Sequence, residues 1–140
     1  MAKFNLEIMT PDKIFLKCEA EMVTITTTDG ERGILAKHIP TIYTVQPGIA
    51  KINKDGQILN AVLTEGLMSV TGDKVTITVD AAEWPEEIDK ARSEAALKRA
   101  KDRISEKKND KINQTRAEAA LKRAAIRIKA SDMKSGLNAK

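Results

Sequence analysis

The pattern of apolar and polar residues changes near residue 84. Before it, short runs alternate between apolar and polar positions, as in residues 22–27, where Val23, Ile25 and Thr27 share one face. This is the period of a half-buried β-strand. After it, apolar residues recur every three or four positions, which is the period of an amphipathic helix. The pattern therefore predicts strands followed by helices.

Turn signals separate the short runs of the first part. The Asp55-Gly56 pair lies between two apolar runs, and such a pair indicates a hairpin because the turn needs positive φ. Many short strands at regular spacing predict a β-sandwich or a flattened barrel. The paired runs are 49–53 with 58–63 and 66–70 with 75–79, and Asp29-Gly30 supplies a further turn.

The second part is free of helix-breaking residues. Pro85 is the last proline, and no glycine occurs from 86 to 135. Since glycine and proline interrupt helices, their absence permits long ones. We place the domain boundary at Trp84-Pro85, which gives a β-sandwich domain over 1–84 and an α-helical domain over 85–140. Trp84 is expected to pack at the junction.

Asn109-Asp110 is the one plausible break in the helical part. It predicts one helix over 86–107 and another over 111–131, with Glu87 or Asp89 in the first turn, where acidic groups favour the helix dipole. A short connection makes the two helices antiparallel neighbours, so the unit is a helical hairpin.

The two helices carry an internal repeat. Residues 92–104 and 116–128 are identical at ten of thirteen positions. Each copy predicts a packing seam of small and aliphatic residues with a row of arginines beside it. The seams are Ser93, Ala96, Leu97, Ala100 and Ile104, then Ala117, Ala120, Leu121, Ala124 and Ile128; the rows are Arg92, Arg99 and Arg103, then Arg116, Arg123 and Arg127.

The arginine rows have two interpretations. If they face the same side, they repel one another in the closed hairpin, and a bound polyanion would favour closure by relieving that repulsion. Alternatively, they are solvated charged faces supported by acidic residues one turn away. The pattern by itself leaves both open.

Composition and charge narrow the function classes. Residues 1–84 carry a net charge of −3 and residues 85–140 one of +7. A single cysteine, Cys18, and a single histidine, His38, make a metal cluster or a Ser-His-Asp triad hard to build, so we expect neither a metal site nor catalytic residues. No apolar run approaches 18 residues, and no secretory signal is visible, so an intracellular protein without a spanning helix is expected.

Residues 29–40, with the sequence DGERGILAKHIP, resemble a segment of the epsilon subunits of F-type ATP synthases. The family pattern G-E-x-G-I-x-x-x-H-x-P is matched in full, and Pro47-Gly48 and the strand start at 65–67 also fit. The resemblance covers essentially the whole chain. It implies a sandwich of about ten strands followed by a C-terminal two-helix hairpin.

The resemblance also implies a function. It suggests a non-catalytic subunit of the central stalk that couples proton or other ion translocation to ATP synthesis. By this resemblance the subunit would lie peripherally at the cytoplasmic face of a bacterial cell membrane. Its sandwich would bind the gamma subunit and the membrane ring of c subunits, with Glu31 and His38 as contact residues. Its hairpin would fold onto the sandwich or extend into the alpha/beta hexamer, where it meets an acidic segment of the beta subunit and impedes hydrolysis.

Some bacterial members of this family bind ATP as a regulatory ligand on the folded hairpin. Their motif, Ile/Leu-Asp-x-x-Arg-Ala, is matched by residues 88–93 except at Ser93. No cofactor is required, and the nucleotide would regulate the subunit without being hydrolysed there. Arginine suits phosphate because its planar donor fork matches two oxygens. The residues that the resemblance assigns to the nucleotide are Glu83, Ile88, Asp89, Arg92, Arg99, Arg123 and Arg127.

The sequence is also compatible, less well, with two other functions. The basic hairpin alone is compatible with a nucleic-acid-binding module, although it holds no aromatic residue for base stacking and its acidic residues are interleaved with the basic ones. A small enzyme is disfavoured because no nucleophile and base are paired in the sequence.

Overall fold

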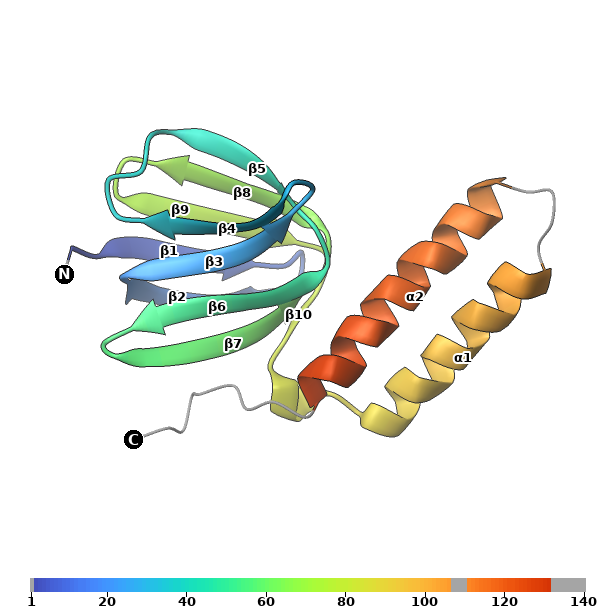
Figure 1. Ribbon diagram of the computed structural model, residues 1–140. Helices are drawn as coiled ribbons and strands as arrows, with labels where there is room; N and C mark the ends of the chain where they lie inside the picture. Colours follow the sequence, from blue (N-terminus) through green and yellow to red (C-terminus); the bar gives the residue numbers. More distant parts are fainter. Residues whose placement is uncertain (1, 107–110, 132–140) are drawn as a thin grey trace.

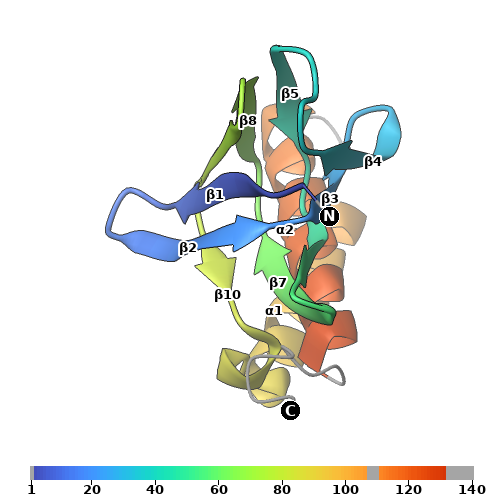
Figure 2. The same cartoon turned by 90° about the vertical axis from the view of Figure 1, so that its left-hand side faces the viewer.

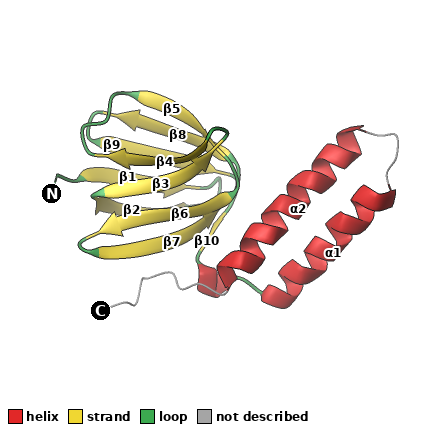
Figure 3. Ribbon diagram, viewed as in Figure 1, coloured by secondary structure: helices red, strands yellow, loops and turns green. Residues whose placement is uncertain are grey.

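The computed structural model describes residues 2–106 and 111–131, with side chains for 2–102 and 115–131. Strands fill the first part and helices the second, as Figure 1 and Figure 3 show. The expected β-sandwich followed by an antiparallel helical hairpin is confirmed. The elements are β1 (Phe4–Met9), β2 (Ile14–Ala20), β3 (Met22–Thr27), β4 (Gly30–Leu35), β5 (Thr41–Val45), β6 (Gly48–Lys54), β7 (Gln57–Leu63), β8 (Gly66–Thr71), β9 (Lys74–Val79), β10 (Ala82–Glu83), a 3₁₀ turn (Pro85–Glu87), α1 (Lys90–Glu106) and α2 (Lys111–Ser131).

The ten strands form one hydrogen-bonded sheet that folds over on itself. Its order is β10-β7-β6-β3-β5-β8-β9-β1-β2, with β4 paired to β3. The sheet bends where β3 meets β5, because only Thr27 and Val45 pair there. β2 then packs across onto β6. The pairing of β1 with β9 is parallel, whereas the other strand pairs in the described part of the chain are antiparallel.

The predicted alternation sets the core. Val23, Ile25 and Thr27 are buried along β3, and their neighbours on the strand are only half-buried. The Asp55-Gly56 turn joins β6 to β7 with φ of 50° and 78°, as its hairpin requires. The largest fully buried side chains all belong to the sandwich: Leu6, Ile8, Ile25, Ile34, Ile52, Leu63, Met68, Ile77, Val23, Val45, Val70 and Val75.

The helices pack on each other through the predicted seam. Ser93 and Ala100 of α1 and Ala117 and Ala124 of α2 are buried, so the closest contacts are between small side chains. Leu97, Leu121 and Ile128 are half-buried beside them, and the side chain of Ile104 lies outside the described residues. The seam prediction is confirmed for the positions that the structure describes.

The hairpin meets the sandwich through α2. Among the described residues, α2 contacts β6, β7 and the 3₁₀ turn, whereas the main partner of α1 is α2. Figure 2 shows both helices on the same side of the sandwich, behind the strands in that view. α1 therefore depends on α2 for its place in the closed molecule.

The junction between the two parts is well packed. Trp84 stacks on Phe15 with the ring centroids 4.5 Å apart and lies against the sandwich core, as its position at the boundary predicted. Buried Thr64 accepts a 2.8 Å hydrogen bond from the Ala81 N–H through its hydroxyl, and its own N–H donates to the Ala81 carbonyl. These contacts fix the start of β10 beside the end of β7.

Candidate functional site: an arginine-lined pocket at the base of the hairpin

A pocket of about 460 Å³ lies where the first turns of α1 approach the later turns of α2. β10 and the 3₁₀ turn supply its other wall. Three arginines and three carboxylates line it together with small and apolar residues. Its lining consists of Glu83, Glu87, Ile88, Asp89, Arg92, Ser93, Ala96, Arg99, Ala124 and Arg127.

The start of α1 forms one side of this pocket and differs from the prediction. The helix was expected from residue 86, but it begins at Lys90. Residues 85–87 form a 3₁₀ turn in which the Glu87 carboxylate accepts a 3.2 Å hydrogen bond from the Trp84 N–H. Ile88 is extended, so a continuous helix cannot start before it. The helix expected over 86–107 is therefore wrong at its first residues.

Asp89 is the N-cap of α1. From the sequence, Glu87 or Asp89 was expected in the first turn of the helix, but Asp89 precedes that turn. Its carboxylate accepts a 3.1 Å hydrogen bond from the Arg92 N–H, and its carbonyl accepts one of 3.0 Å from the Ser93 N–H. A carboxylate at this place satisfies a backbone donor that has no partner inside the helix. The cap aligns the first turn so that Arg92 and Ser93 both face the pocket.

Two arginines of α2 are bound by carboxylates of the sandwich. The Arg127 Nε donates to Glu83 Oε1 on β10 at 2.8 Å, and the Arg123 Nε donates to Glu65 Oε1 at 2.8 Å. Arg123 and Arg127 are one helical turn apart, so the two pairs lie one above the other along α2. Acidic groups of the sandwich therefore neutralise part of the positive charge of the arginine row on α2.

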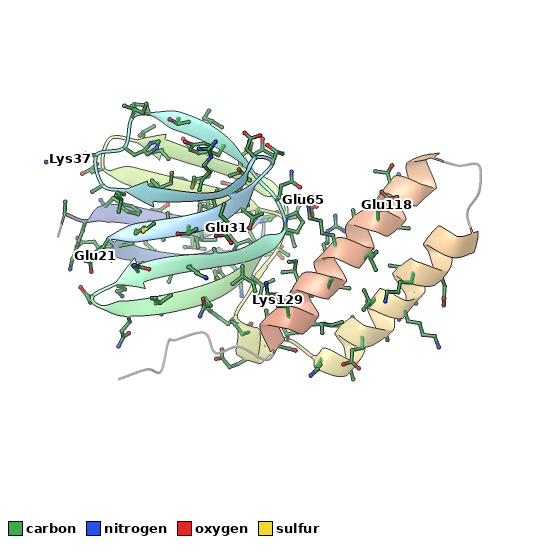
Figure 4. The ribbon with its side chains drawn as sticks, in the orientation of Figure 1. Glu21, Glu31, Lys37, Glu65, Glu118 and Lys129 are labelled. Atoms are coloured by element: carbon green, nitrogen blue, oxygen red, sulfur yellow. The ribbon has the colours of Figure 1, made fainter. Side chains whose placement is uncertain are left out.

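The Glu65–Arg123 pair lies in an adjacent groove of about 330 Å³. Figure 4 shows Glu65 at the end of the sandwich that faces α2. Partial burial by itself would raise the pKa of Glu65, but the hydrogen bond and charge of Arg123, a backbone hydrogen bond and the charge of Lys122 bring this pKa below its ordinary value. Glu65 is thus ionised at neutral pH and suited to hold a guanidinium.

The structure brings six of the seven predicted nucleotide residues to the main pocket. These are Glu83, Ile88, Asp89, Arg92, Arg99 and Arg127. The seventh, Arg123, lies in the adjacent groove together with Arg127. Ser93, the departure from the family motif, is only 7% exposed and also lines the main pocket.

Sequence reasoning missed several residues of the site. Glu65 was named only as part of a strand start, because nothing in the local pattern links it to Arg123 across 58 positions. Glu87, Ala96 and Ala124 also line the pocket. Ala96 and Ala124 were predicted as members of the two packing seams. Because each seam lies beside a row of arginines, the sequence pattern indicated that both alanines would lie near the arginines of the pocket.

The other predicted residues lie away from this pocket. Glu31 is exposed on β4, opposite Thr26 of β3. His38 lies in the loop after β4, where its ring nitrogen Nδ1 is 2.7 Å from the Ile39 carbonyl and its ring makes an edge contact with Tyr43. Figure 4 shows the neighbouring Lys37 at the end of the sandwich opposite the hairpin. The loop that holds Lys37 and His38 and the hairpin therefore lie at different ends of the sandwich, whereas Glu31 lies beside the turn between β3 and β4.

Within the described side chains, no group of three or more His, Cys, Asp or Glu residues is placed to hold a metal ion. Over the same part of the chain, neither helix has both the length and the apolar character needed to cross a membrane.

Comparison with known proteins identifies the class to which this architecture belongs. Residues 3–85 match the family described as the ATP synthase delta/epsilon chain, beta-sandwich domain, and residues 86–132 match the long alpha-helix domain of the same chain. The class is therefore the two-part chain in which a β-sandwich precedes long helices.

The chain belongs to the ATP synthase delta/epsilon family. It is 49% identical over 107 residues to the ATP synthase epsilon chain of Ruminiclostridium cellulolyticum, covering 76% of this chain and 80% of that one. It is 47% identical over 109 residues to the epsilon chain of Clostridium novyi, covering 76% and 83%. The expected resemblance is confirmed, and with it the expectation of an ATP synthase subunit that is not itself an enzyme.

Solved structures agree on the fold. A chain in the cryo-EM structure of the Euglena gracilis mitochondrial ATP synthase, described as OSCP/F1/c-ring, superposes with a TM-score of 0.81 at 26% identity, covering 95% of this chain and 83% of that one. A chain in the central stalk/c-ring structure of the Tetrahymena thermophila mitochondrial ATP synthase gives a TM-score of 0.62 at 18% identity and supports the fold alone.

Proposed function

We propose that this chain is a central-stalk subunit of an ATP synthase and that its hairpin carries a regulatory ATP site. The observation that supports the site is the gathering of Arg92 and Arg99 of α1 and Arg127 of α2 around one pocket. Several donor forks converging from different elements suit a polyphosphate, which presents several anionic oxygens. A ligand of this kind would link α1 to α2.

Such a link would favour the closed hairpin. The seam between α1 and α2 buries small side chains, so it supplies little hydrophobic energy. A ligand shifts an equilibrium by its differential affinity for the two states. A triphosphate that contacts arginines of both helices binds the closed hairpin and not the open one. ATP in the cell would therefore hold the hairpin on the sandwich.

The open hairpin would be the inhibitory form. A net charge of +7 over residues 85–140 suits an acidic segment of the beta subunit, and extension into the alpha/beta hexamer would impede ATP hydrolysis. ATP would therefore relieve inhibition when it is abundant. In this proposal the subunit couples ion translocation to ATP synthesis in both hairpin states.

The sandwich would hold the subunit in the stalk. Its partners would be the gamma subunit and the ring of c subunits, and Glu31 and His38 would contribute contacts. The Euglena relative comes from a structure that contains the c-ring, which supports a position near the ring. The placement of the His38 loop away from the hairpin supports separate binding and regulatory ends. The subunit would lie peripherally at the cytoplasmic face of the bacterial membrane.

Calorimetry with matched arginine variants tests the nucleotide site. Arg99→Gln should weaken ATP binding at least tenfold, because a charge-assisted contact to phosphate is worth about 1.5–3 kcal/mol. Arg116→Gln is the control, since Arg116 repeats the position of Arg92 but is exposed and outside the pocket. Absence of both binding heat and a melting shift with millimolar ATP would refute the site.

A truncated holoenzyme tests the regulatory role. A complex whose subunit lacks residues 86–140 should still assemble and synthesise ATP, and its hydrolysis rate should rise. Over the described part of the helices, no residue contributes to the core of the sandwich, which supports a sandwich that folds without them. Failure of the truncated chain to join the complex would contradict the proposed division between the two parts.

The comparisons favour this function over a nucleic-acid-binding hairpin, since both family models describe ATP synthase chains. Two of the hairpin arginines are also engaged by carboxylates of the sandwich, which leaves less positive charge for a nucleic-acid backbone.

A further inference from the structure

The two ion pairs between α2 and the sandwich differ in their relation to the pocket. Glu83 and Arg127 both line the main pocket, so a bound anion would compete with Glu83 for the Arg127 guanidinium. Glu65 and Arg123 lie in the adjacent groove, and neither lines the main pocket. The Glu65–Arg123 contact is therefore the one that a ligand in the main pocket can leave intact.

The backbone around Glu65 is held firmly. The Glu65 carbonyl accepts a hydrogen bond of 3.1 Å from the Asp80 N–H. The next residue is Gly66, where an added Cβ would collide with the Thr78 carbonyl oxygen on β9. Such close backbone approach leaves little room for the turn to move. Glu65 thus presents its carboxylate from a rigid part of the sandwich.

The contact of Arg123 with Glu65 fixes the position of α2 next to the pocket. It lies one helical turn before Arg127 on the same face of α2. Fixing Arg123 against Glu65 sets both the rotation of α2 and its position along the sandwich, and this brings Arg127 and Ala124 to the pocket wall. The side chains of Glu65 and Arg123 are 35% and 38% exposed, so the pair is accessible enough to break and re-form.

We propose that Glu65 and Arg123 form a latch that holds α2 on the sandwich whether or not the pocket is occupied, so that Arg123 is a positioning residue for the ATP site and not a contact of the ligand. This inference rests on the proposed function, because it concerns the assembly of the same site. It differs from the role that the family resemblance assigns to Arg123. The lowered pKa of Glu65 supports it, since the carboxylate stays charged at neutral pH.

Breaking the latch should have two measurable effects in the full-length chain. Glu65→Gln keeps the side-chain size but removes the charge. Amide hydrogen exchange in α2 without nucleotide should rise about two- to fivefold, the range for a partly exposed ion pair. ATP binding measured by calorimetry should weaken by a similar factor, because fewer molecules hold the pocket closed. Exchange in the strands of the sandwich should not change.

The reversed pair decides between positioning and direct contact. The variant Glu65→Arg with Arg123→Glu restores the latch with its charges exchanged. Both α2 exchange and ATP affinity should return toward the wild-type values if Arg123 only positions the helix. If exchange recovers but ATP affinity stays lost, the guanidinium of Arg123 touches the ligand and the proposal is overturned.

Controls separate this proposal from the ATP site itself. Asp55→Asn breaks the 2.7 Å Lys3–Asp55 ion pair within the sandwich and should leave both readouts unchanged. If Glu65→Gln leaves α2 exchange unaltered, the latch does not exist. If the wild-type chain binds no ATP, the proposed function fails, and the exchange measurements alone still confirm or refute the latch.

Discussion

The sandwich and the hairpin are built from different kinds of buried side chain. The sandwich buries Leu6, Ile8, Met68 and Ile77 among a dozen large aliphatic residues, whereas the buried positions among the described side chains of the hairpin are serine and alanine. A buried Leu, Ile or Met contributes about 1.5–3 kcal/mol, and alanine far less. This difference in buried side chains suits a sandwich that keeps its shape and a hairpin that changes its contacts.

The ion pairs between the hairpin and the sandwich are also weaker than the packing inside the sandwich. Among the described side chains, two ion pairs join α2 to the sandwich, and their side chains are roughly one-third exposed. Pairs of this kind contribute about 0–1 kcal/mol each. These ion pairs are therefore small terms that a ligand or a competing surface can outweigh, while the buried side chains of the sandwich contribute large ones.

Removing a large side chain from the sandwich should have the greatest effect. Ile77 is fully buried on β9, so Ile77→Ala should lower the free energy of unfolding by about 2–5 kcal/mol. Denaturant unfolding followed by Trp84 fluorescence measures this, since Trp84 packs against the sandwich core. A loss below about 1 kcal/mol would mean that the core is less tightly packed than described.

Enlarging a residue in the helical seam should have a smaller and more local effect. Ala117 is 2% exposed between α1 and α2, so Ala117→Leu should cost about 1–3 kcal/mol through overpacking. Because the sandwich core contains none of the hairpin side chains that the structure describes, amide exchange should rise in the helices and stay constant in the strands. Faster exchange throughout the sandwich would show that the two parts unfold together.

Acid should loosen α2 through Glu65. The pKa of this carboxyl is lowered in the folded chain, so its stabilising contribution is present above the unfolded-state pKa and is lost as pH falls through the folded-state value. Its charged surroundings are Arg123, Lys122, Asp80 and Arg127. The NMR shifts of α2 amides should be flat around neutral pH and should change only in acid, below the ordinary titration range of a glutamate carboxyl. The same transition in Glu65→Gln would assign it to another group.

An exposed ion pair of the sandwich should matter least. Asp55 pairs with Lys3 at 2.7 Å, but both side chains are well exposed. Asn is also tolerated at the positive φ of this turn position. Asp55→Asn should leave the thermal midpoint unchanged within error in calorimetry. A clear drop would show that surface charge contributes to the sandwich as well as to the hairpin.

Local patterns predicted much of the fold. The Asp55-Gly56 turn and the alternation in β3 depend on neighbouring residues alone, and both are found as expected. The start of α1 was misplaced because good helix-forming residues begin at 86. Pro85, the 3₁₀ turn and the Asp89 cap delay the helix to Lys90, and this competition between local conformations is not visible in composition.

The internal repeat shows why the site was harder to predict. Arg92 and Arg116 occupy equivalent positions, yet Arg92 lines the pocket and Arg116 does not. Arg99 and Arg123 are equivalent too, yet Arg123 is paired with Glu65. The same local sequence has different surroundings in the two helices, since among the described residues α2 is the helix that packs on β6 and β7 of the sandwich. The family motif predicted the pocket residues of α1, while the partners of α2 required the tertiary structure.

The parallel pairing of β1 with β9 has a consequence for biosynthesis. Asn5 on β1 lies beside Lys74 on β9 in the sheet. One edge of β1 therefore stays unpaired during synthesis until β9 has left the ribosome. Contacts between such distant positions slow the search for the native topology. The hairpin is synthesised after the strands and forms from local contacts, so it can fold quickly. It therefore packs on the sandwich soon after the last strand pairs of the sheet have formed.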